Sequence, residues 1–379
     1  MRQVLIRPSF QDWCGNRLFE TGTSFNALYR EAFSQWREAA SADGFELNTW
    51  DLRPVETADV FWFQDLPESR SEFDAILRRC RPGCRLVLQI LETPLLSLQA
   101  FHPANQTGFH SVLRYDDIGQ MSDGHFHYRL PNTRVDVAEG VSFQDRRGLL
   151  MLNSNRVEGF WAMRRPGLAG LPAVGKLLNG WMMSPGMMHE YLFQERYSYR
   201  RRLARSAEDG RENFLDIYGP GWKGEQISWA RGFPNRPYRC ARGVTKEPKH
   251  SLCQRYRFVA AVENYQGARG YISEKIFDAL FAGAVPVYLG DEQISERIPT
   301  QAFVDVRNFS NPRQLLDKLI AMEESEWRAL REAGQQFLNS PQFSLFDNAQ
   351  FVHAAMRALW HAMHHDNIGR PVVSQRTAH

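Results

Sequence analysis

The feature that most constrains this chain is a regular alternation of short apolar runs with segments of helical periodicity. Apolar runs at 1–9, 45–52, 58–66 and 84–92 are typical of buried strands, and the segments between them repeat apolar residues at helical spacing. Strands separated by helices predict a parallel sheet with helices on its faces. A second alternating series begins near residue 147. The sequence therefore predicts the α/β class.

Length divides these two series into domains. At roughly 150 residues per domain, 379 residues suggest about two domains. A polar, turn-rich stretch at 134–148 separates the two series. We predict an N-terminal domain at 1–145, a C-terminal domain at 146–345, a C-terminal helix at 346–365 and a tail at 366–379.

Composition excludes several classes of protein. Hydrophobic residues at 43% and charged residues at 23% are ordinary for globular chains, which argues against disorder, collagen or coiled coil. No uncharged apolar run of about 18 residues occurs, so we expect no membrane span. The first residues lack the apolar core of a signal peptide, which favours a cytoplasmic location. A net charge of +3 is too small to imply nucleic acid.

Metal-binding patterns are incomplete in this sequence. Cys80 and Cys84 form one pair, but no second Cys/His pair with zinc-ligand spacing accompanies them. His361 and His365 have the i,i+4 spacing of a metal pair, yet no glutamate lies between them and no third ligand is evident. We expect two reduced cysteines beside a turn, a solvated helix end, and no metal site.

Three glycines have the spacing of a dinucleotide-binding motif. Gly219, Gly221 and Gly224 follow an apolar run at GxGxxG spacing. A dinucleotide site needs a helix to begin there, and Pro234 and Pro237 stop such a helix. We therefore expect a loop after the strand.

Two segments each admit two interpretations. Basic residues outnumber acidic ones between Arg196 and Arg257, which fits either a small anionic ligand or a solvated basic helix. The Gly-, Pro- and Met-rich segment 159–193 fits either a membrane- or acceptor-contacting loop or an insertion folded onto its domain.

The strongest signal is a set of three short motifs. They are YRFVAAVEN at 256–264, GYISEK at 270–275 and AGAVPVYLG at 282–290. Ser273 is placed to cap a helix whose first turn carries Glu274 and Lys275, and unpaired N–H groups there form an anion site. The strand before this helix is expected to place Glu263 and Asn264 beside the anion site. The alternative is that Ser273 and Glu274 simply favour a helix start.

These motifs resemble the α-1,3/4-fucosyltransferases of glycosyltransferase family 10. The corresponding family pattern is Tyr-Lys-Phe, Phe-Glu-Asn, Tyr-(Ile/Val)-Thr-Glu-Lys and Val-Pro-(Val/Ile)-x-x-Gly, with Val262 and Ser273 as conservative replacements here. Weaker similarities at 91–94 and 152–155 extend the resemblance over about residues 85 to 320. It implies a GT-B fold, in which two Rossmann-like domains face each other across a cleft and the second holds GDP-fucose.

The resemblance also implies an activity. Such an enzyme moves L-fucose from GDP-fucose to a hydroxyl of an acceptor glycan with inversion, in surface polysaccharide or lipopolysaccharide synthesis. No obligatory cofactor is expected, and the sequence has no Asp-x-Asp for a diphosphate-bridging metal. The implied partners are GDP-fucose and an oligosaccharide or glycolipid, with no nucleic acid and with peripheral contact at the inner membrane face. Alternatives are another GDP-deoxyhexose donor, or a non-catalytic nucleotide- or glycan-binding module.

The family's donor-binding residues map onto the second domain. Lys275 is expected to pair with the diphosphate, and Glu274 to lie near the ribose or fucose, where it can steady positive charge on the sugar. Asn264 and Tyr271 are expected to contact the nucleotide. The family's phosphate-binding arginine corresponds best to Arg200.

Two assignments stay open in the sequence. Arg201 and Arg202 remain alternatives to Arg200, because the three are adjacent. Glu92 is the expected general base, at the end of a strand in the first domain. A second alignment places the base of some bacterial members near Ile90, and under it this chain would lack the usual base.

Overall fold

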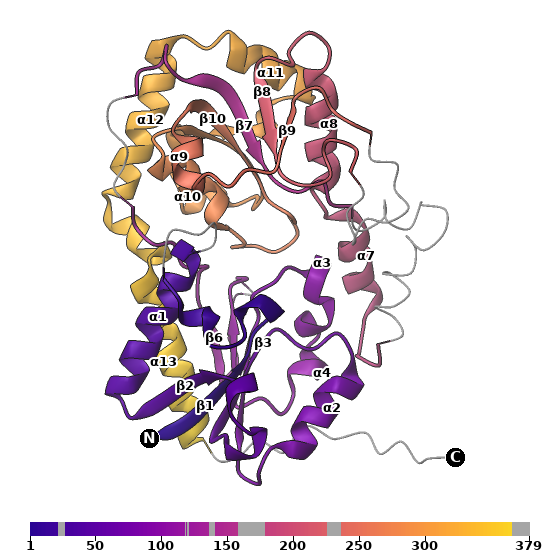
Figure 1. Cartoon of the computed structure of the whole chain (residues 1–379), viewed down its shortest axis with the longest axis vertical. Helices are drawn as coiled ribbons and strands as arrows, with labels where there is room; N and C mark the ends of the chain where they lie inside the picture. Colours follow the sequence, from indigo (N-terminus) through magenta and orange to yellow (C-terminus); the bar gives the residue numbers. More distant parts are fainter. Residues whose placement is uncertain are drawn as a thin grey trace. The chain divides into compact units, whose positions relative to one another are not determined.

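Two parallel sheets organise the part of the chain that the computed structural model describes, residues 1–21, 27–117, 119, 121–135, 141–157, 179–225 and 236–365. Unit 1 comprises 1–133, 174–191 and 346–379, and unit 2 comprises 134–173 and 192–345. Helices lie on both faces of each sheet (Figure 1). The predicted pair of Rossmann-like α/β domains is confirmed.

In unit 1 the sheet runs in the order β2-β1-β3-β4-β5-β6, with every neighbouring pair parallel. Its strands are β1 (Arg2–Arg7), β2 (Phe45–Thr49), β3 (Val60–Gln64), β4 (Arg85–Gln89), β5 (Ser111–Arg114) and β6 (His125–His127). Its helices are α1 (Ala27–Ala42), α2 (Arg70–Arg79), α3 (Pro94–Ser97), α4 (Pro103–Gln106) and α13 (Asn348–His364). Along the chain, the assignment changes from unit 1 to unit 2 within α7 (Pro185–Phe193), after Tyr191.

Strand β3 shows why this sheet needs helices on both faces. Its side chains alternate between the faces, and all five residues are buried. Trp62 packs on Trp36 of α1 at 4.5 Å between ring centroids, and Phe63 packs on Phe73 of α2 at 5.2 Å. An apolar run without polar alternation is therefore stable only as a strand covered on both sides.

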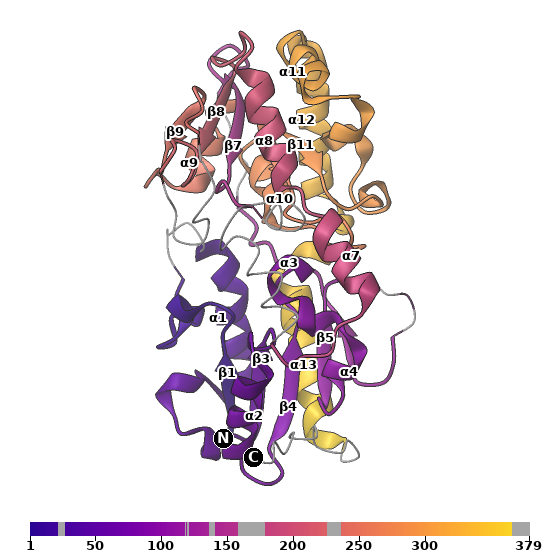
Figure 2. The same ribbon diagram turned by 90° about the vertical axis from the view of Figure 1, so that its right-hand side faces the viewer.

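Helix α13 belongs to the core of unit 1, although the sequence set it apart as a separate C-terminal helix. Phe351 contacts Phe33 of α1 at 5.0 Å and Tyr128 at 5.7 Å between ring centroids. The Ser111 hydroxyl of β5 donates a hydrogen bond to the Ala358 carbonyl at 2.8 Å. Figure 2 shows α13 running beside the strands of this unit. The chain thus returns to unit 1 after completing unit 2.

In unit 2 the sheet runs in the order β12-β11-β10-β7-β8-β9, again with parallel neighbours. Its strands are β7 (Arg147–Leu152), β8 (Leu215–Tyr218), β9 (Ala241–Gly243), β10 (Tyr256–Val262), β11 (Val285–Leu289) and β12 (Val304–Asp305). Its helices are α8 (Tyr197–Ala207), α9 (Lys249–Cys253), α10 (Glu274–Phe281), α11 (Pro312–Ile320) and α12 (Glu324–Leu338).

The two faces of β10 pack against different helices. Phe258 and Val262 belong to a cluster that includes residues of α8 and α11. Val259 belongs to a second cluster with residues of α9 and α10. This layering brings the first turn of α10 to the carboxyl end of β10, where ligands bind in open α/β sheets.

The remaining sequence predictions concern the glycine-rich loop, the short strands, the Met-rich segment and membrane spans. Residues 219–225 form turns and bends after β8, where a loop was expected. The short strands β5, β6 and β9 were not anticipated. The section 159–178 of the Met-rich segment lies outside the described residues. Across the described ranges, no helix has the length and apolar character needed to cross a bilayer.

Candidate functional site

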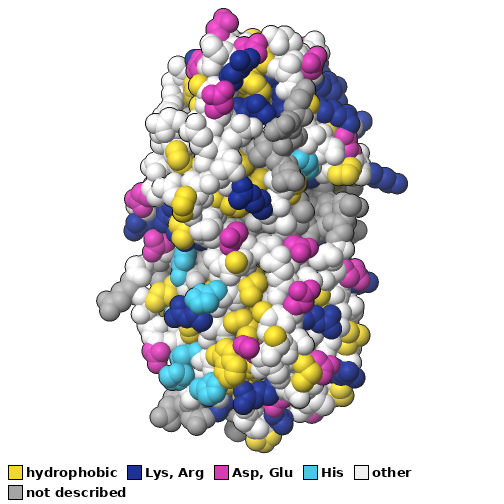
Figure 3. Space-filling view, turned by 90° about the vertical axis from the view of Figure 1, so that its left-hand side faces the viewer, with side chains coloured by type: hydrophobic (Ala, Val, Ile, Leu, Met, Phe, Trp, Pro, Cys, Tyr) yellow, Lys and Arg dark blue, Asp and Glu magenta, His cyan; other side chains and the backbone are white. Residues whose placement is uncertain are grey.

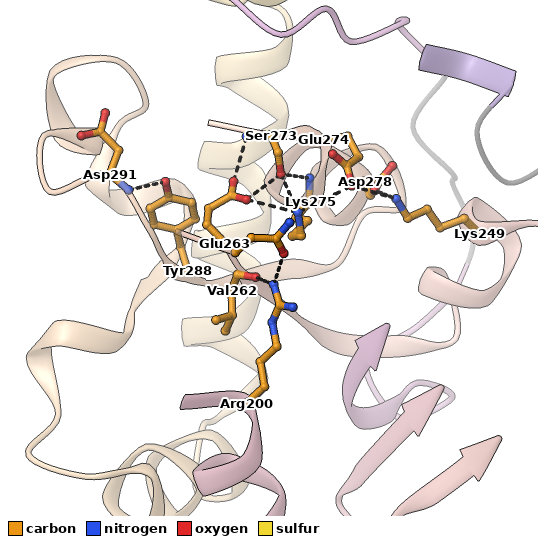
Figure 4. A network of polar contacts seen from close by, with 11 residues as sticks. Arg200, Lys249, Val262, Glu263, Ser273, Glu274, Lys275, Asp278, Tyr288 and Asp291 are labelled. Atoms are coloured by element: carbon orange, nitrogen blue, oxygen red, sulfur yellow. Dashed lines mark hydrogen bonds and ion pairs between the residues drawn. The ribbon is translucent and has the colours of Figure 1, made fainter. Parts of the chain in front are cut away.

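A buried carboxylate and a helix cap meet at the carboxyl end of β10. Glu263, which follows the strand, is fully buried. Its Oε1 accepts the backbone N–H of Ser273 at 2.8 Å, and its Oε2 accepts the Ser273 hydroxyl proton at 2.7 Å (Figure 4). Ser273 is the N-cap of α10, and its Oγ accepts the N–H of Lys275. The predicted cap is confirmed, and Glu263 fixes its orientation.

Lys275 places a positive charge at this helix start. Its Nζ donates to Ser273 Oγ at 2.9 Å and lies 3.2 Å from Glu263 Oε2. Only 13% of the Lys275 side chain is exposed. A buried carboxylate needs such a partner, because an isolated charge in a protein interior is costly. Ion pairing therefore holds the ammonium beside the first turn of α10, where an anion is favoured.

Glu274 is held ionised by two lysines. Its Oε1 lies 3.5 Å from Nζ of Lys249 and 3.8 Å from Nζ of Lys275. Burial acts to raise the pKa of Glu274, but the two ammonium groups outweigh this effect and lower the pKa to about 2. Lys249 also forms an ion pair with Asp278 one turn further along α10. Near neutral pH, Glu274 therefore carries a negative charge.

Arg200 reaches the same strand end from α8. It is 2% exposed, and its Nη2 donates to the Val262 carbonyl and to Asn264 Oδ1, the latter at 2.8 Å. Burial lowers the pKa of the Arg200 guanidinium. Its Nε–H has no hydrogen-bond partner among the described residues. A buried donor left in this way costs about 1–3 kcal/mol and favours a ligand that supplies an acceptor.

The two neighbouring arginines have different surroundings. Arg201 is also buried, and its Nη1 donates to the carbonyl of Arg156. Arg202 is exposed and lies over the Tyr199 ring at 5.5 Å. Of the three candidates, Arg200 alone has a described contact with Asn264. The geometry therefore favours Arg200 at this site.

Close packing explains the last glycine of the third motif. A Cβ on Gly290 would lie 2.4 Å from the Tyr288 hydroxyl and 2.6 Å from Cγ of Glu263. The Asp291 N–H donates to that hydroxyl at 2.9 Å, and the Asp291 carboxylate accepts from the N–H of Gly270 at 3.0 Å. The end of β11 thus supports both Glu263 and the loop that leads to α10.

The predicted site residues of unit 2 have a common location. Lys275 contacts Glu263, Ser273 and Glu274, while Arg200 bonds to Asn264, the residue that follows Glu263. Tyr271 is 5% exposed and lies two residues before the cap. Sequence reasoning assigned no role to Glu263 and missed Lys249. The apolar run before Glu263 was a usable signal for a buried carboxylate, whereas nothing local in the sequence indicated Lys249.

Glu92 lies in unit 1, three residues beyond β4. Its backbone N–H and that of Leu91 donate to Asp65 Oδ1 at 3.1 and 2.9 Å. The Tyr115 hydroxyl donates to the Glu92 carbonyl at 3.1 Å. The Glu92 residue is half-buried. Its backbone is therefore fixed at the carboxyl edge of the unit 1 sheet, where a ligand-facing carboxylate is expected.

Asp65 is a buried residue that sequence reasoning missed. It follows β3, is 4% exposed and has a φ of 57°, an uncommon backbone conformation for a residue other than glycine. Burial raises the pKa of Asp65, while hydrogen bonds from Ser9 and from the amides of Leu91 and Glu92 act in the opposite direction. The available signal was an aspartate directly after a fully apolar strand.

The family comparison covers the segment built around β10 and α10. Residues 214–331 match the family described as "Glycosyltransferase family 10 (fucosyltransferase) C-term". The match covers less than half of the chain, and within it this segment is similar to glycosyltransferase family 10. The resemblance carried by the three motifs is thereby confirmed, and Glu263, Glu274 and Lys275 all lie inside the matched range.

Curated proteins similar to this chain align with it over short segments. The chain is 48% identical over 77 residues to mouse "Alpha-(1,3)-fucosyltransferase 7", covering 20% of each protein. It is 33% identical over 75 residues to "Alpha-(1,3)-fucosyltransferase FucT" of Helicobacter pylori, covering 20% of this chain and 16% of that one. It is 34% identical over 88 residues to "GDP-fucose protein O-fucosyltransferase 3" of Xenopus laevis, covering 21% and 19%. The chain thus spans about a fifth of these relatives' length.

Solved structures extend the similarity of fold over more than nine-tenths of the chain. An α1,3-fucosyltransferase crystal structure aligns with a TM-score of 0.50 at 12% identity, covering 97% of this chain and 91% of that one. An α-glucosyltransferase in complex with UDP-glucose and DNA containing an abasic site aligns with a TM-score of 0.53 at 10% identity, covering 94% and 99%. The fold is that of the GT-B glycosyltransferases.

Proposed function

We propose that this chain is an inverting fucosyltransferase that moves L-fucose from GDP-fucose to a hydroxyl of an acceptor glycan. The observation that carries the proposal is the family 10 match over the segment that unites Glu263, Ser273 and Lys275. The names of the aligned relatives, two α-1,3-fucosyltransferases and one GDP-fucose-dependent transferase, support fucose and guanosine diphosphate as the donor's two halves.

In this proposal the function of unit 2 is to bind and stabilise the leaving group, GDP. Breaking the bond between fucose C1 and the diphosphate oxygen leaves GDP with additional negative charge. Lys275, the N–H groups at the start of α10 and Arg200 supply fixed positive charge and donors for that group, which is how preorganised sites stabilise a developing anion. Asn264 and Tyr271 would contact the nucleotide. Glu274, ionised near neutral pH, would stabilise the positive charge that develops on the sugar.

The acceptor hydroxyl needs a base. In our proposal the Glu92 carboxylate removes its proton while the oxygen attacks fucose C1 from the face opposite the diphosphate, which inverts the anomeric centre. An ammonium, a guanidinium and a helix N-terminus balance the diphosphate charge in this scheme, so we propose a metal-independent transfer. The product would be an α-1,3- or α-1,4-linked fucoside.

The cellular role extends this proposal. We place the enzyme at the cytoplasmic face of the inner membrane, in peripheral contact with glycolipid or oligosaccharide acceptors for surface polysaccharide or lipopolysaccharide synthesis. Sedimentation of the full chain with acceptor-bearing vesicles tests the membrane contact. Recovery of all the protein in the soluble fraction would contradict it.

A donor titration tests the central proposal. Thermal unfolding of the full chain with GDP, UDP, ADP and CMP, each with and without EDTA, should show a melting shift with GDP alone that EDTA does not change. A ligand at ~100 times its Kd stabilises the folded state by roughly 2.7 kcal/mol, enough for a visible shift. A larger shift with UDP, or loss of the GDP shift in EDTA, would contradict the proposed donor site.

A turnover assay separates the alternatives. Mass spectrometry of an acceptor panel incubated with GDP-fucose should detect a gain of one deoxyhexose. GDP binding without turnover across that panel would favour the non-catalytic module. Faster turnover with another GDP-deoxyhexose would favour that donor, because a pocket built for one hydroxyl pattern rejects a sugar that leaves its polar groups unpaired.

A further inference from the structure

A second cluster of side chains that can bind a ligand lies in unit 1, outside the segment that matches family 10. Asp123, from the turn between β5 and β6, meets His361 and His365, from the last turn of α13 and the residue after it. One possible ligand atom from each residue lies within 4.8 Å of the others. Among the described residues, this is the single group of three or more histidine, cysteine or acidic residues with such spacing. Figure 3 shows histidine side chains gathered on one face of this unit.

Hydrogen bonds prepare His361 as a metal ligand. The Ser111 hydroxyl proton is used on the Ala358 carbonyl at 2.8 Å, so Ser111 Oγ is left to accept from His361 Nδ1–H at 3.2 Å. The proton on Nδ1 leaves Nε2 with its lone pair. That Nε2 atom is buried and has no hydrogen-bond partner among the described residues. Metal-bound histidines use this arrangement, in which the second ring nitrogen donates to a supporting group.

The carboxylate is at ligand distance from that lone pair. His361 Nε2 lies 3.4 Å from Asp123 Oδ1. Zinc–nitrogen and zinc–oxygen bonds of about 2.0–2.1 Å in a tetrahedron place neighbouring ligand atoms about 3.3 Å apart. Two lone-pair atoms facing each other at this distance attract only when a proton or a cation lies between them.

The third ligand and the turn complete the arrangement. The exposed His365 ring stacks on that of His361, with centroids 4.0 Å apart, and one of its nitrogens lies within 4.8 Å of the other two ligand atoms. Gly124, with a φ of 78°, follows Asp123. A Cβ on Gly124 would lie 3.0 Å from the His110 carbonyl and 3.3 Å from Cε1 of His361. Glycine therefore lets the turn approach the imidazole closely.

We propose that Asp123, His361 and His365 bind one divalent transition-metal ion of the zinc class. Two imidazoles and one carboxylate suit zinc, cobalt, nickel or copper, whereas magnesium and calcium prefer sites made of oxygen ligands. The ion joins the β5–β6 turn to the end of α13, which makes the site a structural clip within unit 1. No third ligand for His361 and His365 was evident in the sequence, because Asp123 lies 238 positions before His361 along the chain. This proposal is independent of the transferase reaction.

Metal titration of the full chain tests the site. Tag-free protein, stripped with chelator and dialysed, is titrated with Zn²⁺ by calorimetry and with Co²⁺ by visible absorption. We expect one saturable site per chain, a cobalt ligand-field band, and no competition from excess Mg²⁺. Zinc, but not magnesium, should raise the melting temperature. No stoichiometric site in the wild type would overturn the proposal.

Matched variants assign the ligands. Asp123→Asn and His365→Ala change exposed side chains, so folding should be retained, and each should weaken zinc binding at least tenfold. His353→Ala removes an exposed histidine from the same helix and should bind zinc like the wild type. Unchanged affinity in Asp123→Asn would show that the histidine pair acts without the carboxylate, and would overturn the three-ligand site. Equal weakening in His353→Ala would overturn it as well.

Discussion

The two sheets carry buried carboxylates at their carboxyl ends, and these carboxylates are stabilised in different ways. In unit 2, Glu263 accepts two hydrogen bonds from Ser273 and lies 3.2 Å from the Lys275 ammonium. In unit 1, Asp65 accepts hydrogen bonds from Ser9 and from the backbone amides of Leu91 and Glu92. Among the described residues, no lysine or arginine forms an ion pair with Asp65.

This difference suits the two strand ends to different functions. The strand end of unit 2 carries fixed positive charge beside a helix N-terminus, which suits an anionic group. At the strand end of unit 1 the donors to Asp65 are neutral, and two of them are the backbone amides of Leu91 and Glu92. Under the proposed function, unit 2 holds the leaving diphosphate and unit 1 orients the base.

The largest expected effect comes from the unit 1 carboxylate. Glu92→Gln keeps the shape of the side chain but removes its basicity, so turnover with GDP-fucose should fall by about 10²–10⁴. GDP affinity should be unchanged, because the donor residues lie in unit 2. Steady-state turnover and calorimetric GDP titration measure the two quantities.

Two further variants sharpen the assignment of the base. Glu68→Gln changes an exposed glutamate of the same unit and should keep full activity. Wild-type turnover in Glu92→Gln would remove Glu92 from the mechanism. If Asp65→Asn then lost activity but kept the wild-type melting temperature, Asp65 would be assigned as the general base. The two strand ends would then differ in the role of their buried carboxylates, catalytic at Asp65 and structural at Glu263.

The next effect comes from the unit 2 ammonium. Lys275→Ala should reduce turnover by about 10²–10³, the cost of removing one preorganised donor to a developing charge, and should weaken GDP binding. It also leaves the Glu263 charge buried without its partner, so the melting temperature should fall. Lys318→Ala, at an exposed ion pair on α11, should change neither quantity.

A double variant separates charge from folding. Glu263→Gln combined with Lys275→Met removes both buried charges and should recover much of the melting temperature lost in Lys275→Ala. GDP affinity should stay low, because the ammonium is still missing. Wild-type GDP affinity in the double variant would contradict the assigned role of Lys275.

A smaller effect is expected at Arg200. Arg200→Lys keeps a positive charge but loses the planar group that donates to Val262 and Asn264, so GDP affinity should fall about tenfold. Arg202→Lys, on the exposed side of the same helix, should bind GDP like the wild type. Calorimetric titration of both variants distinguishes the two arginines. The reverse order of affinities would assign the donor contact to Arg202.

Local sequence chemistry predicted the parts of this molecule that depend on neighbouring residues. The apolar run at 60–63 indicated a strand covered on both faces, and Ser273 indicated the start of α10, because both depend on short-range rules. The motif spacing also brought Glu263 and Lys275 to one place. The need for glycine at Gly290, by contrast, depends on tertiary packing, because Tyr288 and Glu263 leave no space for a Cβ there.

Contacts between distant segments could not be predicted in this way. Helix α13 has no feature that distinguishes a helix of unit 2 from one that returns to unit 1. The meeting of Lys249 with Glu274, and of Asp123 with His361, depends on how the sheets are ordered. Pairing of this kind is set by tertiary packing, and a single sequence does not contain it as a local pattern.

The smallest expected effect tests the electrostatics of unit 2 through acid stability. The pKa of Glu274 is lowered to about 2 from an ordinary value near 4.5, so its ionised form stabilises the fold. That stabilisation is fully present above about pH 4.5 and is lost as pH falls through the folded-state pKa. Because 43% of the Glu274 side chain is exposed, solvent screening limits the contribution to about 1 kcal/mol or less. Glu274→Gln should therefore melt slightly below the wild type at pH 7.

The melting temperatures below pH 4.5 test this explanation. Between pH 4.5 and pH 2.5 the melting temperature of the wild type should approach that of Glu274→Gln, because protonation removes the same charge that the substitution removes. Glu296→Gln, an exposed glutamate of the same unit, should follow the wild type throughout. Calorimetry at half-unit pH steps measures all three proteins. A difference between wild type and Glu274→Gln that stays constant with pH would mean that Lys249 and Lys275 do not hold Glu274 ionised, and the charge contrast between the two strand ends would then rest on Glu263 and Lys275 alone.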